Sequence, residues 1–276
     1  MKTVITCSLL TILRSRSTFI LIALTVGAFA LERGAQAVSP PPDGGYAGNN
    51  TAEGTNALFS LTTGVDSTDL GFQALFHNST GSFNTAEGFR ALFTNTTGAQ
   101  NTANGVNALR SNTTGNLNTA DGVNTLFHNT TGASNTASGV QALFANVTVN
   151  FNNAVASFSL SSNTAGSGNN AFGSAALFSN TTGGQNTAIG DITLHGNTTG
   201  SSNTANGAGA LNSNTTGDAN TAIGVDALLS NTTATENTGV GAFTLQNNRT
   251  GGTSGGSGTL VILHCSITPP APSTSH

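Results

Sequence analysis

Charged residues are scarce in this chain, since Asp, Glu, Lys and Arg make up only 7% of its 276 residues, where about a quarter is usual. Trp is absent, and Tyr and Met each occur once. Exposed amphipathic helices need charged helix formers on their polar faces, so helical bundles, coiled coils and Rossmann-type enzymes are disfavoured. The 35 glycines do not recur at every third residue, which excludes collagen. A hydrophobic content of 36% and a low net charge argue against disorder, so a composition this uneven indicates a repeat.

Basic residues are almost lacking beyond residue 37, where only Arg90, Arg110 and Arg249 stand against ten acidic residues, for a net charge of −7. Nucleic-acid binding needs clustered Lys and Arg to displace the counterions of phosphate groups. Binding to anionic lipid needs the same residues. We therefore expect no nucleic-acid partner.

A long apolar run occurs only near the N-terminus, at 19–31, where it follows several basic residues. The small-x-small sequence at 35–37 supplies a cleavage pattern, so residues 1–37 are predicted to be a signal peptide that is cleaved near Ala37. The run is short for a membrane anchor, which is the alternative, and no span is expected in the mature chain. The mature protein is then expected to be exported from the cell, with Cys265 as its single cysteine.

Residues 50–253 form twelve units of 17 residues without insertion or deletion. The consensus is N-T-A-x-G-x-x-A-L-F-x-N-T-T-G-x-x, and positions are numbered 1–17 below. Position 5 is Gly except at Ala156, and position 12 is Asn except at Leu61. Position 9 is Leu in every unit: Leu58, Leu75, Leu92, Leu109, Leu126, Leu143, Leu160, Leu177, Leu194, Leu211, Leu228 and Leu245.

Seventeen residues are too few for a pair of helices but sufficient for two short strands and two turns. The repeat predicts an all-β fold, a parallel β-solenoid (β-roll) of about twelve coils spaced by about 4.8 Å. We expect strands at positions 1–4 and 8–11, a left-handed corner at the glycine of position 5, a second corner of stacked Asn at 12–15, and inward-pointing Leu. Residues 152–168 are the least regular unit. A Pro/Gly-rich leader at 38–49 and an irregular tail at 254–276 flank the repeat.

Position 10 carries six phenylalanines in the same register, which are candidates for binding or self-association: Phe59, Phe76, Phe93, Phe127, Phe144 and Phe178. The same position accepts Arg110 and His195, so it is not simply sealed core. A surface that is buried against another chain or a ligand is one interpretation. A second interior stripe that tapers along the coil axis is the other. Position 4 changes from polar to apolar halfway along, which predicts a change in the environment of that face.

Catalytic and metal chemistry finds little support in the pattern. Glu53, Glu87 and Asp121 share position 4 but fall on alternate coils, about 9–10 Å apart. His77 and His128 share position 11 but lie three coils apart, about 14 Å, too far for one metal ion. We expect no enzyme activity, no metal and no cofactor, and a solenoid carbohydrate-active enzyme is the less favoured alternative. The Asn-x-Thr sequons at position 12 are interpreted as a corner ladder rather than glycan acceptors.

Threonine recurs at positions 2, 13 and 14 of most units. Positions 13 and 14 fall in a corner and make a poor flat array, whereas position 2 would line one strand. A flat face of regularly spaced Thr could order water, so an ice-binding solenoid is the alternative function from another class.

The motif N-T-A-x-G at 186–190 is one example of the repeat, and the same motif at 220–224 is followed by Ala227 at the eighth position. These segments resemble the head repeats of trimeric autotransporter adhesins, the YadA-like family. The resemblance covers 50–253 and implies a left-handed parallel β-roll, a homotrimer, a bacterial surface and a role in attachment. Family repeats are commonly shorter than 17 residues, and neither a heptad stalk nor barrel-anchor segments follow here. The expected function is a secreted or cell-surface, non-enzymatic, adhesin-like head.

Overall fold

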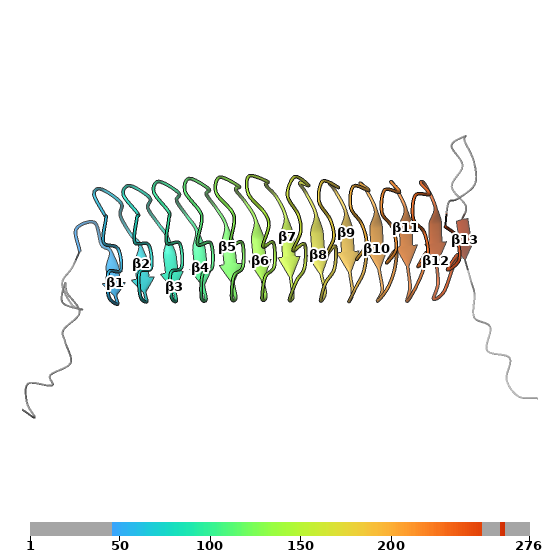
Figure 1. Ribbon diagram of the computed structural model, residues 1–276, viewed down its shortest axis with the longest axis horizontal. Helices are drawn as coiled ribbons and strands as arrows, with labels where there is room; N and C mark the ends of the chain where they lie inside the picture. Colours follow the sequence, from blue (N-terminus) through green and yellow to red (C-terminus); the bar gives the residue numbers. More distant parts are fainter. Residues whose placement is uncertain (1–45, 250–259, 263–276) are drawn as a thin grey trace, which may run out of the picture. The chain divides into compact units, whose positions relative to one another are not determined.

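The computed structural model describes residues 46–249 and 260–262, and these residues form a parallel β-solenoid (Figure 1). The prediction of an all-β fold with 17-residue coils is confirmed, and the described residues contain no helix. We number the coils 1–12 from Asn50 to Asn237. One short strand per coil joins a single parallel sheet in sequence order. The strands are β1 (Thr51–Glu53), β2 (Thr68–Leu70), β3 (Thr85–Glu87), β4 (Thr102–Asn104), β5 (Thr119–Asp121), β6 (Thr136–Ser138), β7 (Asn153–Val155), β8 (Asn170–Phe172), β9 (Thr187–Ile189), β10 (Thr204–Asn206), β11 (Thr221–Ile223), β12 (Thr238–Val240) and β13 (Leu260–Ile262).

Each strand of the repeat occupies positions 2–4, one residue fewer than predicted. From β1 to β12, neighbouring strands pair with a constant offset of 17 residues, as in Thr85 opposite Thr102. Side chains alternate across a strand, so Ala86 lies inside the coil while Glu87 faces solvent. The fixed repeat length follows from this register, because an insertion would move every later residue out of the ladder.

The second predicted strand, at positions 8–11, does not form, and a run of turns takes its place. Positions 7 and 9 have left-handed backbone, with φ of 56° at Arg90 and 49° at Leu92, which prevents an extended chain. The hydrogen bonds between coils nevertheless continue, because the Leu92 N–H donates to the Ala108 carbonyl at 3.0 Å. Backbone hydrogen bonds therefore link successive coils on this side as well, although no strand forms there.

The corner at position 5 has the predicted left-handed geometry in all eleven glycines, with φ between 120° and 148°. Ala156, the exception, has a φ of 99°. A side chain at Gly88 would bring its Cβ to 2.6 Å from the Gly105 carbonyl oxygen of the next coil. Glycine is thus required here both for its conformation and for the close approach of coils.

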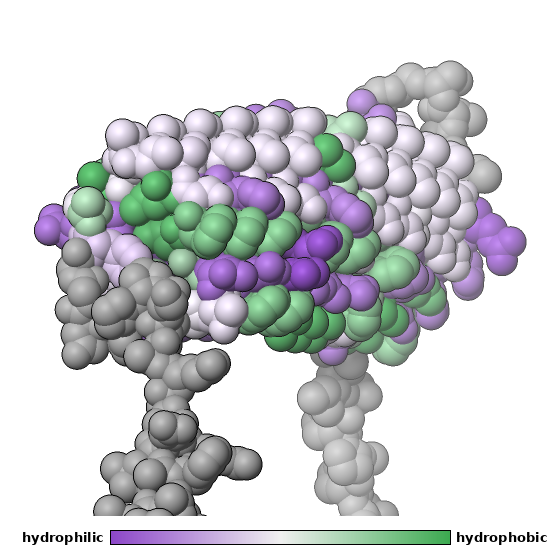
Figure 2. All heavy atoms as spheres, turned by 60° about the vertical axis from the view of Figure 1, so that its left-hand side comes forward, coloured by the Kyte–Doolittle hydropathy of each residue, from purple (hydrophilic) through white to green (hydrophobic). Residues whose placement is uncertain are grey.

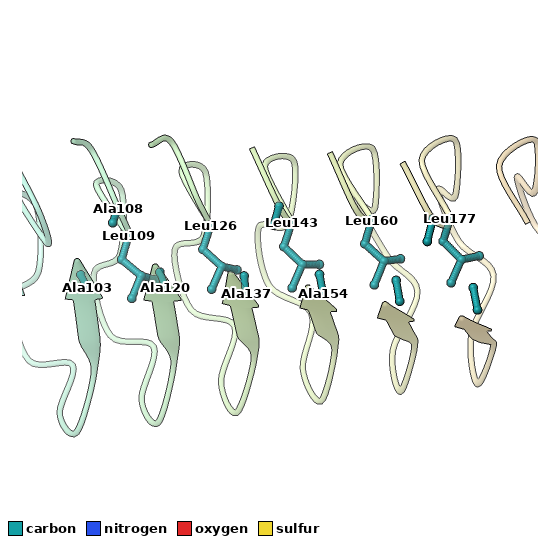
Figure 3. Close-up of a cluster of buried hydrophobic side chains, with 14 of the residues drawn as sticks. Ala103, Ala108, Leu109, Ala120, Leu126, Ala137, Leu143, Ala154, Leu160 and Leu177 are labelled. Atoms are coloured by element: carbon teal, nitrogen blue, oxygen red, sulfur yellow. The ribbon is translucent and has the colours of Figure 1, made fainter. Parts of the chain in front are cut away.

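The leucines of position 9 form one column inside the coils, packed against the alanines of positions 3 and 8 (Figure 3). Leu126 and Leu143 are completely buried, whereas Leu245 in the last coil is only partly buried. Figure 3 shows the leucine side chains pointing toward the strand alanines Ala120, Ala137 and Ala154. Small residues are required on the strand because a larger side chain would meet this column.

The interior also holds two columns of buried asparagine, at positions 1 and 12, so it is not the dry apolar channel that the leucines suggest. Asn95 Nδ2 donates to Asn78 Oδ1 and to the Gly98 carbonyl, both at 2.9 Å. In the other column, the Asn101 N–H donates to Asn84 Oδ1 at 3.0 Å. Most of these amides are satisfied by their own coil and by a neighbouring coil, which offsets the cost of burying the polar groups.

The position-12 ladder breaks at two places, where Asn146 Oδ1 and Asn231 Oδ1 have no hydrogen-bond partner. Both coils carry a side chain at position 15, Val149 and Ala234, where the other ten coils have Gly. A Cβ on Gly183, at this position in coil 8, would lie 2.6 Å from the asparagine Oδ1 of its own coil. A side chain at position 15 thus crowds the asparagine Oδ1, and in both coils this oxygen is the atom that lacks a donor, while Nδ2 keeps its acceptors. One break falls beside residues 152–168, the unit that the sequence marks as irregular.

The flanking segments differ in part from the sequence interpretation. Residues 1–37, the predicted signal peptide, lie outside the described residues. At the end of the predicted leader, Tyr46 bridges to Asn50 and packs against the core. The tail expected to be irregular at 254–276 contains β13, which pairs with β12 through Leu260 opposite Thr238.

Candidate interaction surface

The phenylalanines of position 10 stack along the solenoid because successive coils bring the same position into contact. The rings of Phe59 and Phe76 have centroids 5.2 Å apart and are inclined by 4°. Phe76 and Phe93 follow at 5.4 Å, as do Phe127 and Phe144. Phe59 is 67% exposed, whereas the other rings are half-buried. The stripe is therefore a surface feature with an apolar base, not a sealed part of the core.

Arg110 fills the one gap in this stack. Its Cζ lies 5.9 Å from the ring centroid of Phe93 and 5.3 Å from that of Phe127, within the range of cation–π attraction. The band consequently runs unbroken through coils 1–6. Phe178, the sixth candidate, lies apart from the others and stacks on His195 at 5.2 Å.

The two histidines of position 11 complete the packing of these rings. His77 makes edge contacts with Phe76 at 4.7 Å and Phe93 at 5.0 Å. His128 has the same relation to Phe127 and Phe144, at 4.8 Å from each. Their imidazoles contact aromatic rings, and no group of three His, Cys, Asp or Glu residues that could hold a metal ion occurs among the residues described.

Position 6 carries a second apolar band that the sequence interpretation missed. It lies in coils 2–6 and each of its members is 41–42% exposed: Phe72, Phe89, Val106, Val123 and Val140. The rings of Phe72 and Phe89 stack at 5.3 Å. The signal was present as five apolar residues spaced by 17. It was masked because coils 7–9 have Ser157, Ser174 and Asp191 at this position.

Arg90 joins the two bands. Its Cζ lies 5.1 Å from the centroid of Phe89 in the position-6 band and 5.3 Å from that of Phe93 in the position-10 band. Its Nε donates to Gln73 Oε1 at 2.9 Å, which fixes the side chain. We call the position-10 band of coils 1–6 and the position-6 band of coils 2–6, together with Arg90, the aromatic surface. Figure 2 shows hydrophobic residues gathered in bands along the solenoid with hydrophilic residues between them.

The stacking determines which parts of the phenylalanine rings, faces or edges, remain accessible on the aromatic surface. Phe76 has a ring on each side, Phe59 and Phe93. The faces of the inner rings are thus occupied by one another, and their edges are left for a partner. The inner part of the position-10 band therefore presents ring edges rather than open ring faces.

Position 4 faces solvent along the whole sheet, so the expected change of environment halfway is not seen. Glu53 and Glu87 are exposed in the first half. Phe172, Ile189 and Ile223 are 41–42% exposed in the second half. What changes is the chemistry of the side chains, because the strand face is acidic first and apolar afterwards.

The asparagines of the position-12 sequons are buried from Asn78 to Asn231. In Asn112, Nδ2 already donates to Asn95 Oδ1 at 2.8 Å and to the Gly115 carbonyl at 3.0 Å. A sugar attached to this nitrogen would remove a donor and require space that the interior does not have. The folded coils therefore cannot carry glycans at these positions.

No match to the chain was found among family models, curated proteins or solved structures. The described residues include no helix of sufficient length and apolar character to cross a membrane.

Proposed function

We propose that this chain is a secreted or bacterial cell-surface, non-enzymatic repeat protein, which acts as an adhesin-like head for attachment or self-association. The observation that carries the proposal is the aromatic surface, in which Arg90 joins two exposed apolar bands. Exposed apolar patches of this kind are typical of interaction sites. The ladder of backbone bonds makes the solenoid a scaffold that presents them in fixed register.

The favoured partner is another copy of the chain. A ridge that repeats with the spacing of the coils is matched best by a surface of the same spacing, and a second solenoid has it. The resemblance of the repeats to trimeric autotransporter heads implies a homotrimer of left-handed β-rolls. Six coils at about 4.8 Å each give a contact about 29 Å long, which is compatible with the roughly 800 Å² per partner of a stable interface.

Analytical ultracentrifugation of the purified chain tests the self-association. We expect a trimer, and we expect Phe76→Ser and Phe89→Ser each to weaken assembly at least tenfold, since loss of about 1.4 kcal/mol of apolar burial has that effect. Ile223→Ser is the matched control, because Ile223 is 42% exposed, like Phe89, but lies outside the aromatic surface. A wild-type chain that sediments as a stable monomer would end the proposal.

An ice-binding role is a second candidate, favoured by one observation. Thr187 and Ile189 share the outward side of β9, and Thr221 and Ile223 share that of β11 in the same register. From β9 to β12 the sheet therefore presents an uncharged row of Thr beside a row that is apolar except at Asn206. Thermal hysteresis of the purified chain decides this: activity that Thr204→Lys abolishes supports it, and no activity at high concentration excludes it.

A further inference from the structure

The first two coils depart from the repeat at three interior positions. Leu61 replaces Asn at position 12, so the position-12 ladder ends at Asn78, whose Nδ2 donates only to the Gly81 carbonyl. Ser67 replaces Asn at position 1, and its hydroxyl accepts the Asn84 N–H at 3.3 Å, against about 3.0 Å further along the column. The Ser67 N–H still donates to Asn50 Oδ1 at 2.8 Å, but the two substitutions leave these coils with fewer buried side-chain hydrogen bonds than those that follow.

The third departure places a carboxyl group in the core. Asp69 occupies position 3 of β2, is 0% exposed, and neither of its carboxylate oxygens has a hydrogen-bond partner. Its partners on the neighbouring strands are Ala52 of β1 and Ala86 of β3. Every other coil of the repeat has Ala or Gly at this position. An unpaired charge in such surroundings is strongly unfavourable.

The groups around Asp69 offer it no counter-charge. The leucines and alanines of positions 8 and 9 close the interior across from the strands. Glu53 and Glu87, the charged residues of β1 and β3, are of like sign and face solvent. Among the described residues, the charge of Asp69 acts on Tyr46: burial, and secondarily the negative charge of Asp69, raise the pKa of Tyr46.

Burial raises the pKa of the Asp69 carboxyl from 3.8 to about 8. Because the pKa in the fold lies above the unfolded value, the protonated form favours folding. The end of the solenoid is thus most stable below about pH 4 and loses stability as the pH rises from about 4 to about 8. In a solenoid each coil contacts only its neighbours, so a terminal coil can open while the rest stays closed.

We propose that coils 1 and 2 (50–83) form a pH-responsive end of the solenoid, closed while the Asp69 carboxyl is protonated and opened by its ionisation. Opening separates Phe59 and Phe76 from Phe93, and Phe72 from Phe89, so it removes the first rings of both bands of the aromatic surface. Alkaline pH would thereby shorten that surface. The opening itself does not depend on what the aromatic surface binds.

Tyr46 reports this opening directly, because the chain has one Tyr and no Trp. We expect acrylamide quenching of Tyr46 fluorescence in the full chain to rise severalfold as the pH increases from about 4 to about 8, and to level off above that range. Asp69→Ala and the isosteric Asp69→Asn should both remove the rise. Glu87→Gln, which removes an exposed acid on the next strand, should retain it.

Hydrogen exchange read by mass spectrometry locates the opening. After correction for the intrinsic effect of pH, peptides that cover β1 and β2 should lose protection at alkaline pH, while those of β5–β11 keep theirs. The same quenching curve in wild type and Asp69→Asn, or simultaneous loss of protection along the whole solenoid, would overturn the proposal. If the smaller side chain of Asp69→Ala alters the packing, Asp69→Asn still tests the proposal, because asparagine has the same size as aspartate but cannot ionise.

Discussion

Replacement of Leu126 by Ala is expected to lower the free energy of unfolding by about 2–5 kcal/mol. Leu126 is fully buried in the middle of the leucine column, with Leu109 and Leu143 in the coils on either side. Truncation leaves a cavity that the rigid ladder cannot close, because each coil is held in register by its neighbours. The loss therefore lies toward the upper part of that range.

Denaturant unfolding followed by circular dichroism measures this loss, and Leu245→Ala is the matched control. Leu245 has the same position in the last coil but is only partly buried, so its truncation should cost clearly less. Equal losses for the two variants would show that the column does not stabilise the fold through burial. A loss below about 1 kcal/mol at Leu126 would lead to the same conclusion.

The leucine column also stabilises a backbone that leucine disfavours. Leu92 and Leu143 have φ of 49° and 51°, a left-handed conformation that costs about 1–2 kcal/mol for an L-residue. Full burial of a leucine side chain contributes about 1.5–3 kcal/mol. The two terms are of similar size, so the column compensates for the turns that let seventeen residues close a coil.

This balance explains why the sequence predicts the solenoid but not the run of turns that replaces the second strand, at positions 8–11. The constant period and the invariant Leu indicate stacked coils and an inward column, and Gly at position 5 indicates a corner. Nothing in the residue types reveals that Arg90 and Leu92 adopt left-handed backbone, because neither residue favours it. The turns arise from the closure of the coil, a tertiary constraint that local propensity does not contain.

For the candidate site, the sequence predicted the position-10 band but not the position-6 band. Phe76 and Phe93 could be identified as candidates because phenylalanine is the consensus residue at position 10. Phe89 lies at a position that has no consensus, and only the structure shows that Arg90 contacts both Phe89 and Phe93. Asp69 was visible as one acid in a column of alanines, but its lack of partners depends on the surrounding coils.

The two adjacent glycines of coil 8 should respond in opposite ways to alanine. In Gly183→Ala the new Cβ would lie 2.6 Å from Asn180 Oδ1 and would also meet the Gly200 carbonyl oxygen. Asn180 Oδ1 accepts a hydrogen bond from Asn197 Nδ2 at 2.8 Å. We expect that bond to break, as beside Val149, with a loss of about 1–3 kcal/mol from an unsatisfied buried group and a further penalty from overpacking.

Gly184→Ala should be neutral or stabilising by up to about 1 kcal/mol, because alanine restricts the unfolded chain. Its Cβ would have one close neighbour, the Ser167 carbonyl oxygen at 3.0 Å, and Ala99 and Ala133 already occupy this position in other coils. Thermal unfolding of both variants compares them directly. Because φ at Gly183 is not left-handed, backbone conformation does not explain a loss of stability in Gly183→Ala. A loss confined to this variant would show that the asparagine ladder needs the space beside Gly183. Equal stability of the two variants would show that the asparagines can move without cost.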